Sequence, residues 1–265
     1  MFTPQFVQPN LQSVGDSTFP VTSVSISPAI SIRRYRTQPQ QVLSILGDES
    51  ALAPVVASTE IEPGVYEGGF TCWQGSEALC RYLTTLPIAG KRVIELGCGH
   101  ALPGIQCSLM GASKLVFQDF NEEVLRLATI PNLALNARPG QSTASLFDDA
   151  LFIASSWADL PAFLQANADV PHLSQYDYIL AAEVVYRESN FESLAQSIIS
   201  LLSVSPDGQA LVSGRVTYFG VGGGTDAFSA FISSKVGGNG EKVLCEEVSV
   251  SENLDENILK ITLQR

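Results

Sequence analysis

The sequence predicts an α/β fold: a seven-stranded, mostly parallel sheet with helices on both faces and an antiparallel pair of strands at the C-terminal end. From residue 61 onward, short runs of β-branched and aliphatic residues alternate with segments of helical periodicity, as in parallel sheets joined by helices. The last two apolar runs have no helix between them, which indicates antiparallel pairing. At 265 residues and 45% hydrophobic, the chain is long enough to bury one substantial core.

The predicted strands of the parallel part are aliphatic runs at 92–96, 114–118, 150–155, 178–182 and 209–216. Helices are predicted at 77–83, 102–110, 122–127 and 191–202, the last with Asn190 or Ser189 as its N-cap. A final helix near 226–235 precedes the antiparallel pair at 243–250 and 257–263. The Pro/Gly/Ser-rich stretch 137–145 is predicted to be a loop.

The first 60 residues differ in composition from the rest of the chain. They are rich in Ser, Pro, Gln and Thr and show no sustained period, so we expect a mostly flexible N-terminal arm before a domain that spans 61–265. The arm contains one basic cluster, formed by Arg33, Arg34 and Arg36. Such a short cluster is interpreted either as a weak import or docking element or as a solvated patch.

The charge balance and the few metal-binding residues exclude some functions. The chain has 27 acidic and 15 basic residues, a net charge of -12. This charge argues against nucleic acid as a direct partner and favours a basic protein, although acidity also serves solubility alone. His100 and His172 are the only two histidines and none of the five cysteines forms a CxxC pair, so no metal site is predicted.

The same features predict where the protein works. An odd number of cysteines without a framework pattern indicates buried thiols in a reducing compartment. The first residues, MFTPQFVQPN, lack the basic start and apolar core of a signal peptide, and no run of about 18 apolar residues follows. We therefore expect a cytoplasmic and nuclear protein with no membrane partner.

Residues 91–104, KRVIELGCGHALPG, predict a strand, a tight glycine turn and a helix, a pattern that brings backbone close to a small ligand. A dinucleotide fingerprint needs a third glycine, but Gly97 and Gly99 are followed by Leu102. Glu95 would repel a pyrophosphate but suits a ligand that carries an ammonium and a sulfonium, such as S-adenosylmethionine. Asp119 ends the next strand and is placed to accept both ribose hydroxyls. A glycine turn that binds nothing is the remaining alternative.

Four stretches carry a family resemblance, and the second of them contains the glycine turn. They are EPGVYEGGFTCW (62–73), VIELGCGHALPGI (93–105), FQDFNEEVL with TIPN (117–132) and YFGVGGG (218–224). Together they resemble the eukaryotic protein-histidine N-methyltransferases, which are class I, seven-β-strand methyltransferases with a Rossmann-like fold. The matches span 61–265. The glycine loop indicates only the superfamily, whereas VYEGG, FQDFN and YFGVGGG favour this branch over its lysine-methylating relatives.

The resemblance implies S-adenosyl-L-methionine as cofactor and a set of residues that bind it. The segment that closes over the methionine part would be Trp73, Gln74, Gly75 and Ser76, with Gly97 and Gly99 as the floor. The ribose would lie at Asp119 with Gln118 and Phe120 beside it, and the adenine between Ser156 and Trp157. Ala182 and Glu183 would end the fourth strand next to the transferable methyl group.

The chemistry that the resemblance implies is methyl transfer to a histidine of a protein. The reaction needs an unprotonated nucleophile in line with the methyl group, and an imidazole with an ordinary pKa of about 6.5 supplies one at neutral pH. Glu183 is predicted to accept the other ring N–H, and Tyr186 or Tyr218 to orient the ring. The implied substrate is a basic, large-subunit ribosomal protein, and the enzyme is expected to be a monomer.

Two departures from the family pattern keep alternatives open. Ala101 stands where the family has a third glycine, which is costly if its φ is positive, and Ala182 stands where a hydroxyl residue is frequent. One alternative is a non-catalytic module of the same fold that uses YFGVGGG to dock a ribosomal or chaperone partner. The other is a protein-lysine methyltransferase of the same superfamily.

Overall fold

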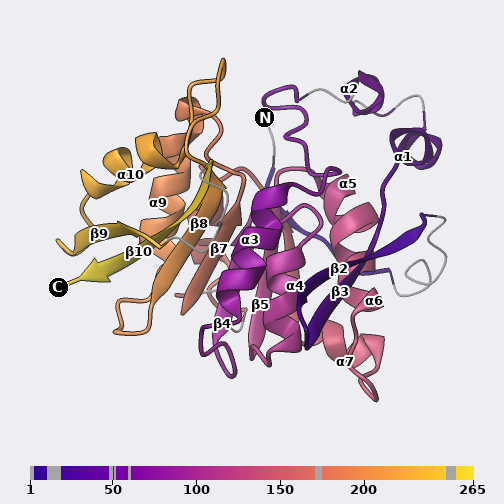
Figure 1. The fold of residues 1–265 in the computed structure, drawn as a ribbon, viewed down its shortest axis with the longest axis horizontal. Coiled ribbons are helices and arrows are strands. Elements are labelled where there is room, and N and C mark those ends of the chain that lie inside the picture. The colour runs from indigo at the N-terminus through magenta and orange to yellow at the C-terminus, as the bar shows by residue number, and fades with distance from the viewer. Residues whose placement is uncertain are drawn as a thin grey trace.

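The computed structural model describes residues 3–10, 19–47, 50, 52–58, 61–170, 175–248 and 255–265. Its central feature is an eight-stranded sheet with the strand order β1-β6-β5-β4-β7-β8-β10-β9 (Figure 1). The prediction of an α/β fold with a mostly parallel sheet is confirmed. One strand more than the predicted seven is present, because β1 (Gln5–Phe6) pairs antiparallel with the outer strand β6.

Five parallel strands form the middle of the sheet, and all five were predicted. They are β4 (Arg92–Leu96), β5 (Lys114–Asp119), β6 (Ala150–Ala154), β7 (Tyr178–Ala182) and β8 (Gln209–Arg215). Their side chains are buried on both faces, which explains the continuous apolar runs in the sequence. The strand order reverses between β4 and β7, and in such sheets ligands bind outside the carboxyl ends of the strands at that point.

The C-terminal strands close the sheet with reversed direction, as predicted. β10 (Glu256–Gln264) runs antiparallel to both of its neighbours, β8 and β9 (Lys242–Glu247). Within the predicted run 243–250, residues 249 and 250 lie outside the described residues.

Helices cover both faces of the sheet (Figure 1). α3 (Gln74–Leu83) and α4 (Leu102–Leu109) pack on one face, and α9 (Phe191–Leu201) and α10 (Thr225–Ser233) on the other, all at predicted positions. Asn190 is the N-cap residue of α9, but its side chain makes no capping hydrogen bond, and a 3-10 turn, η2 (Glu188–Asn190), leads into the helix.

Three helical segments differ from the prediction. The helix expected at 122–127 begins as α5 (Glu122–Val124), widens into a π-helical turn, η1 (Leu125–Thr129), and continues as α6 (Ile130–Leu135). The stretch 137–145, predicted to be a loop, contains the start of α7 (Thr143–Phe147), because the Ser142 hydroxyl accepts a capping hydrogen bond from the Ser145 amide. α8 (Leu160–Ala166) was not predicted.

The prediction of a flexible arm over 1–60 is wrong for the described residues. Besides β1, this segment forms the hairpin of β2 (Val21–Ser27) and β3 (Ile30–Tyr35), and the helices α1 (Pro39–Leu46) and α2 (Ala53–Ser58). β3 lies beside α6 (Figure 1), where the Asn132 side chain accepts a hydrogen bond of 2.7 Å from the Tyr35 amide. Ile32 is fully buried. The hairpin therefore belongs to the folded body.

Candidate active site

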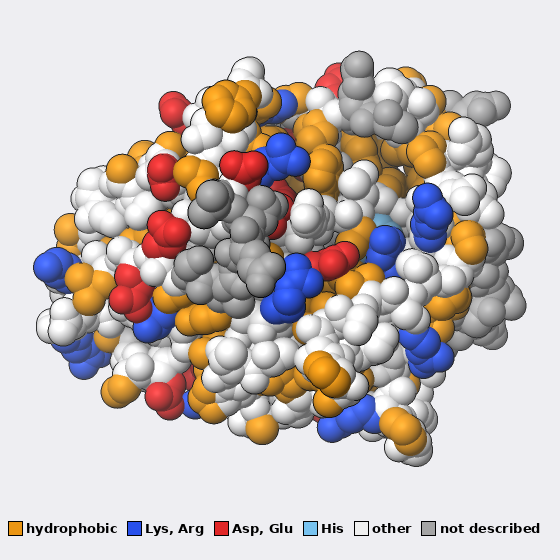
Figure 2. All heavy atoms as spheres, in the orientation of Figure 1, with side chains coloured by type: hydrophobic (Ala, Val, Ile, Leu, Met, Phe, Trp, Pro, Cys, Tyr) orange, Lys and Arg blue, Asp and Glu red, His pale blue; other side chains and the backbone are white. Residues whose placement is uncertain are grey.

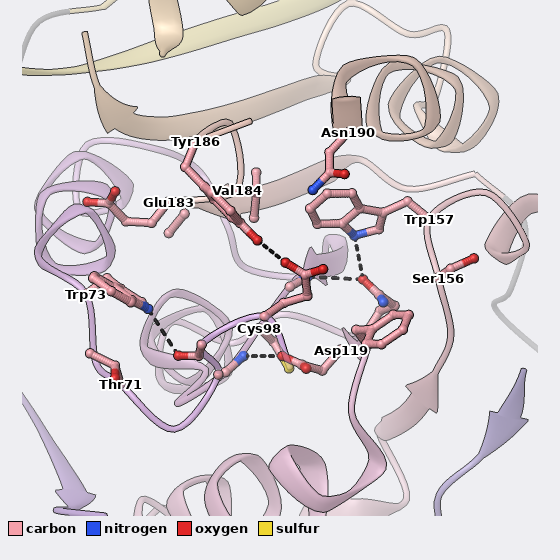
Figure 3. Close-up of a pocket in the computed structure, with 18 of the residues that line it drawn as sticks. Thr71, Trp73, Cys98, Asp119, Ser156, Trp157, Glu183, Val184, Tyr186 and Asn190 are labelled. Carbon is pink, nitrogen blue, oxygen red and sulfur yellow. Dashed lines mark hydrogen bonds between the residues drawn. The ribbon is translucent and has the colours of Figure 1, made fainter. Parts of the chain in front are cut away.

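A single cavity lies at the carboxyl ends of β4, β5, β6 and β7, and the segment 63–76 forms its other wall (Figure 3). Most of the residues predicted to bind the cofactor line it: Trp73, Ser76, Gly97, Gly99, Gln118, Asp119, Phe120, Ser156, Trp157 and Ala182. Of the residues predicted to be catalytic, Glu183 and Tyr186 line it as well. The topology thus brings together residues that are far apart in the chain, such as Trp73 and Tyr186.

The floor of the cavity is the glycine turn that follows β4. Gly97 and Gly99 have φ values of 63° and 49°, in the left-handed region that favours glycine. The side chains at the end of β5 fix the turn: Gln118 accepts a hydrogen bond of 3.0 Å from the Gly97 amide, and Asp119 one of 2.9 Å from the Gly99 amide. A Cβ atom on Gly97 would lie 3.0 Å from Val184, so the close approach leaves little space for a side chain.

Ala101 also adopts a left-handed conformation, with a φ of 60°. A left-handed conformation costs a residue with a Cβ about 1 to 2 kcal/mol. Ala101 therefore bears this cost at the position where the family that the sequence resembles has a third glycine. The turn nevertheless keeps its shape, because the Thr129 hydroxyl of η1 donates a 2.6 Å hydrogen bond to the Gly99 carbonyl. The π-helical turn η1 therefore stabilises the glycine turn through this hydrogen bond.

Asp119 presents a buried carboxylate at the end of β5. Its side chain is 5% exposed and accepts hydrogen bonds from the amides of Gly99 and Asn121. Burial raises the pKa of Asp119 to about 6, since the few donors around it only partly replace water. Hydroxyl groups that donate hydrogen bonds to Asp119 would favour its charged form. The two hydroxyls of a ribose are donors of this kind.

Trp157 is held as one wall of the cavity. Its indole Nε1 donates a 2.9 Å hydrogen bond to the Gln118 side chain, which also fixes the glycine turn. Figure 3 shows Trp157 and Trp73 on opposite sides of the cavity, with Tyr186 between them at the top of the view. The Ser156 hydroxyl donates a 2.6 Å hydrogen bond to Asp159 beside this wall. Planar side chains that face a cavity suit the stacking of a planar base.

Three residues predicted to bind the cofactor lie outside the lining: Gln74, Gly75 and Glu95. Gly75 lies behind the cavity wall, where its amide donates a 2.9 Å hydrogen bond to Glu183. Glu95 is 2% exposed, because strand alternation places it on the same face as Val93, beneath α4. There its carboxyl group accepts a 2.8 Å hydrogen bond from the Gly104 amide, and burial raises the pKa of Glu95 to about 8.

Two tyrosine–glutamate pairs stand at the end of β7. The Tyr218 hydroxyl donates to one Glu183 oxygen, while the other accepts from Gly75, and Figure 3 shows Glu183 directed away from the Tyr186 hydroxyl. The Tyr186 hydroxyl donates to Glu67. The two tyrosine rings meet edge to face, with centroids 6.4 Å apart. Burial, together with the adjacent carboxylates, raises the pKa of each tyrosine far above its usual value, so both remain hydrogen-bond donors.

Tyr218, which was predicted together with Tyr186 as a residue that orients the target ring, is not among the residues that line the cavity. It reaches the site through Glu183, whose φ of 60° turns the carboxylate toward both Tyr218 and α3. Such a strained conformation at a non-glycine residue persists only where several contacts hold it.

Sequence reasoning gave no role to Glu67, which lines the cavity and accepts hydrogen bonds from Tyr186 and from the Gly64 amide at 2.9 Å. The stretch VYEGG, which contains Glu67, was singled out only for its resemblance. Its pairing with Tyr186 is not visible in the sequence, because 119 positions separate the two residues.

His100 lines the cavity but is held by the protein. Its Nε2 lies 3.0 Å from the Phe70 carbonyl and 3.1 Å from the Thr37 hydroxyl, and its Nδ1 lies 3.2 Å from the Asn132 amide nitrogen. Burial lowers the pKa of His100 to about 4, so the ring is neutral. His100 is therefore a packed residue of the glycine turn. His172 lies outside the described residues.

The cavity fits S-adenosylmethionine better than a dinucleotide. Three carboxylates line it, those of Glu67, Asp119 and Glu183, and no lysine or arginine does among the described residues. That charge suits a ligand with an ammonium and a sulfonium and opposes a pyrophosphate. The described part of the chain contains no cluster of three or more His, Cys, Asp or Glu side chains placed to hold a metal ion. It also contains no helix of the length and hydropathy that a bilayer crossing requires.

Comparisons with known proteins agree with this geometry. A family model described as lysine methyltransferase matches residues 61–217. The chain is 35% identical over 176 residues to the histidine protein methyltransferase 1 homolog of Dictyostelium discoideum, covering 66% of this chain and 52% of that protein. It is 32% identical over 195 residues to the homolog of the same name from Bos taurus, covering 67% of this chain and 51% of that protein. The chain thus spans about half the length of these relatives.

Among solved structures, a Streptococcus mutans protein assigned to the SAM-dependent methyltransferases matches with a TM-score of 0.56 at 12% identity. The match covers 91% of this chain and 55% of that one. At this identity the likeness is one of fold alone.

Proposed function

We propose that this chain, which belongs to the lysine methyltransferase family, transfers a methyl group from S-adenosylmethionine to a histidine side chain of a protein. The family match and the two histidine methyltransferase relatives confirm the resemblance seen in the sequence. The observation that carries the proposal is the cavity at the strand switch point, which combines a glycine floor, the Asp119 carboxylate and the Trp157 wall.

Each of these residues has a task in the proposed reaction. Asp119 would accept the ribose hydroxyls, and Trp157 would flank the base. When bound, S-adenosylmethionine supplies a methyl group on a positively charged sulfur that is already a good leaving group. The protein therefore has to hold a neutral imidazole nitrogen about 3 Å from that methyl group and exclude water.

The two tyrosine–glutamate pairs would orient the target ring. Tyr186 lines the cavity, and its hydroxyl group is fixed by Glu67. Glu183 has one lone pair left on each carboxylate oxygen, since each accepts a single hydrogen bond in the structure. One of these is available to the N–H of a target imidazole, which would select the ring nitrogen that attacks.

The substrate that we propose is a basic protein of the large ribosomal subunit. The net charge of -12 supports this, because opposite charge raises the rate of encounter and orients the partners. We propose that the chain acts as a monomer, in the cytoplasm and nucleus, on protein and not on nucleic acid or membranes.

Two observations favour other functions. The description of the matching family names lysine, so a lysine side chain is the second candidate acceptor. The left-handed Ala101 strains the cofactor loop, which is the best support for a non-catalytic module of this fold. In such a module the cofactor would not bind.

A labelled-methyl assay tests the proposal. The purified chain is incubated with S-adenosylmethionine carrying a tritiated methyl group and with proteins purified from large ribosomal subunits. We expect label in protein with the parent chain, and strongly reduced label with Asp119→Ala at the same cofactor concentration. If calorimetric titration of the parent with S-adenosylmethionine gives no saturable heat and no label is transferred, the chain is the non-catalytic module.

A further inference from the structure

The loop between β8 and α10 exposes large hydrophobic side chains next to the active site. Phe219 is 93% exposed and Val221 is 47% exposed, and Phe219 is the most exposed large hydrophobic residue in the described part of the chain. The loop projects from the end of the molecule at the carboxyl end of β8 (Figure 1). Figure 2, in the same orientation, shows hydrophobic side chains at this end with both acidic and basic side chains around them. Exposing a phenylalanine to this extent is unfavourable in water.

The base of this loop is rigid, so the exposure of its tip is imposed by the backbone. The Tyr218 amide donates a 2.9 Å hydrogen bond to the Gly223 carbonyl, and the Gly224 amide one of 2.8 Å to the Val185 carbonyl. A Cβ atom on Gly223 would lie 2.2 Å from the Val185 carbonyl, so only glycine allows this contact. The stretch YFGVGGG thus clamps the loop to the segment that follows β7 and holds Phe219 outward.

The loop is joined directly to the proposed target site. Tyr218, the neighbour of Phe219, donates to Glu183 and packs its ring edge to face on Tyr186. Glu183 and Tyr186 both line the cavity. The loop therefore begins beside the cavity to which a protein substrate would present its histidine.

The surroundings of the loop indicate what kind of partner it meets. Exposed acidic residues lie next to its anchoring segments: Glu188 is two positions after Tyr186, Asp226 lies in the first turn of α10, and the Asp255 carbonyl accepts a hydrogen bond from the Val216 amide. Arg187 and Arg215 are the basic residues of the same segments. With a net charge of -12, the chain as a whole attracts a basic polypeptide.

We propose that Phe219 and Val221 dock an apolar side chain of the basic protein substrate beside its target histidine. This inference rests on the proposed function for the identity of the substrate, but docking has its own readout. Aromatic side chains that become buried at an interface carry much of its affinity, and a loop held in one conformation loses little entropy on binding. The glycines that fix the loop and the exposed Phe219 therefore act together.

The test compares Phe219→Ala/Val221→Ala with the parent chain in two assays. The first measures retention of purified large-subunit ribosomal proteins on the immobilised chain, and the second measures methyl transfer to those proteins. We expect the double variant to retain at most a tenth of the protein that the parent retains. We also expect its KM for protein substrate to rise at least tenfold, with kcat within twofold of the parent value and cofactor affinity unchanged.

A matched control removes exposed apolar surface elsewhere. Val236 is 65% exposed and lies beyond the C-terminal end of α10, in the connection to β9, so Val236→Ala should behave as the parent in every assay. Equal retention by the parent and the double variant, or no retention by either, would overturn the inference. A parent that forms dimers in sedimentation and a double variant that does not would overturn it as well, because the occupant would then be a second copy of the chain.

Failure of the proposed function gives a different result. If retention depends on Phe219 but the parent transfers no methyl group to histidine, the docking role stands and the proposed reaction is wrong. If histidine methylation proceeds with the same KM in the double variant, the reaction stands and the docking role is wrong.

Discussion

Glu95 carries a large and testable pH dependence of stability. Its carboxyl group is buried beneath α4, and burial raises its pKa from 4.5 to about 8. This rise in the pKa of Glu95 corresponds to a contribution of about 5 kcal/mol to the free energy of unfolding. A carboxyl pKa that is raised in the folded state contributes stability that is fully present below pH 4.5 and is lost as the pH rises to 8. The loss amounts to about 1.4 kcal/mol for each pH unit inside this window.

The variant Glu95→Gln replaces the titrating carboxyl group with an amide that does not titrate, and it keeps the shape of the side chain. Its amide oxygen can still accept the hydrogen bond that the Gly104 amide donates at 2.8 Å. Between pH 5 and pH 8 the stability of the parent relative to the variant should therefore fall by about 4 kcal/mol. Urea unfolding of the cofactor-free proteins at pH 5, 6, 7 and 8 measures this. Asp119 and His100 also titrate in or near the window, but both are present in the two proteins, so the comparison isolates Glu95 together with its coupling to Asp119.

A control separates burial from the removal of a charge alone. Glu77 is partly exposed on α3, where it pairs with Arg81 at 3.8 Å, and Glu77→Gln should give a stability curve parallel to that of the parent. A Glu95→Gln curve that also runs parallel to the parent would refute the buried, protonated state of Glu95. Because Glu95 lies outside the cavity, its variant should also bind S-adenosylmethionine within threefold of the parent affinity.

Three further perturbations address the site and the N-terminal segment. Asp119→Ala should weaken cofactor binding by about 2 kcal/mol, roughly thirtyfold, because it deletes a charge-assisted acceptor for two hydroxyls; calorimetry measures this, and an unchanged affinity in a folded variant would contradict the ribose assignment. Deleting residues 1–36 should lower the melting temperature by about 10 °C, since it removes β2 and β3 with the buried Ile32; a shift below 2 °C would show that the hairpin does not stabilise the domain. Glu183→Gln keeps an oxygen for Gly75 but loses the charge to which Tyr218 donates, so single-turnover transfer should slow at least tenfold or methylate both ring nitrogens; an unchanged rate and nitrogen would remove Glu183 as the orienting group.

The parallel core could be predicted because its residues are buried on both faces. Tyr178–Ala182 reads YILAA and is almost completely buried, so no polar residue interrupts the apolar signal. The hairpin of β2 and β3 escaped prediction for the opposite reason. Val21–Ser27 reads VTSVSIS, in which only Val24 and Ile26 are buried, so serine and threonine conceal the alternation. The hairpin is held to the body by Val24, Ile26 and Ile32, which belong to the main hydrophobic core, and by hydrogen bonds to Asn132 and Asn136.

Asp119 was predicted from its place at the end of a strand, and the family resemblance implied Gln118, Ser156 and Trp157. Gln118, Asp119, Ser156 and Trp157 come directly at or after a strand, and the topology brings those ends together. The contacts between distant segments could not be predicted. Glu67 with Tyr186, and Glu183 with Gly75, join residues more than 100 positions apart, and no local pattern pairs them. Glu95 lies outside the cavity, and the sequence already indicates this position, because alternation from Val93 places Glu95 on the α4 face.

The identity of the methylated side chain tests the central claim most directly. Protein from large ribosomal subunits, methylated by the purified chain with deuterated S-adenosylmethionine, is digested and sequenced by tandem mass spectrometry. The account predicts a single deuterated methyl group on a histidine and none after reaction with Asp119→Ala. Deuterated methyl groups on lysine, with unmodified histidines, would contradict it.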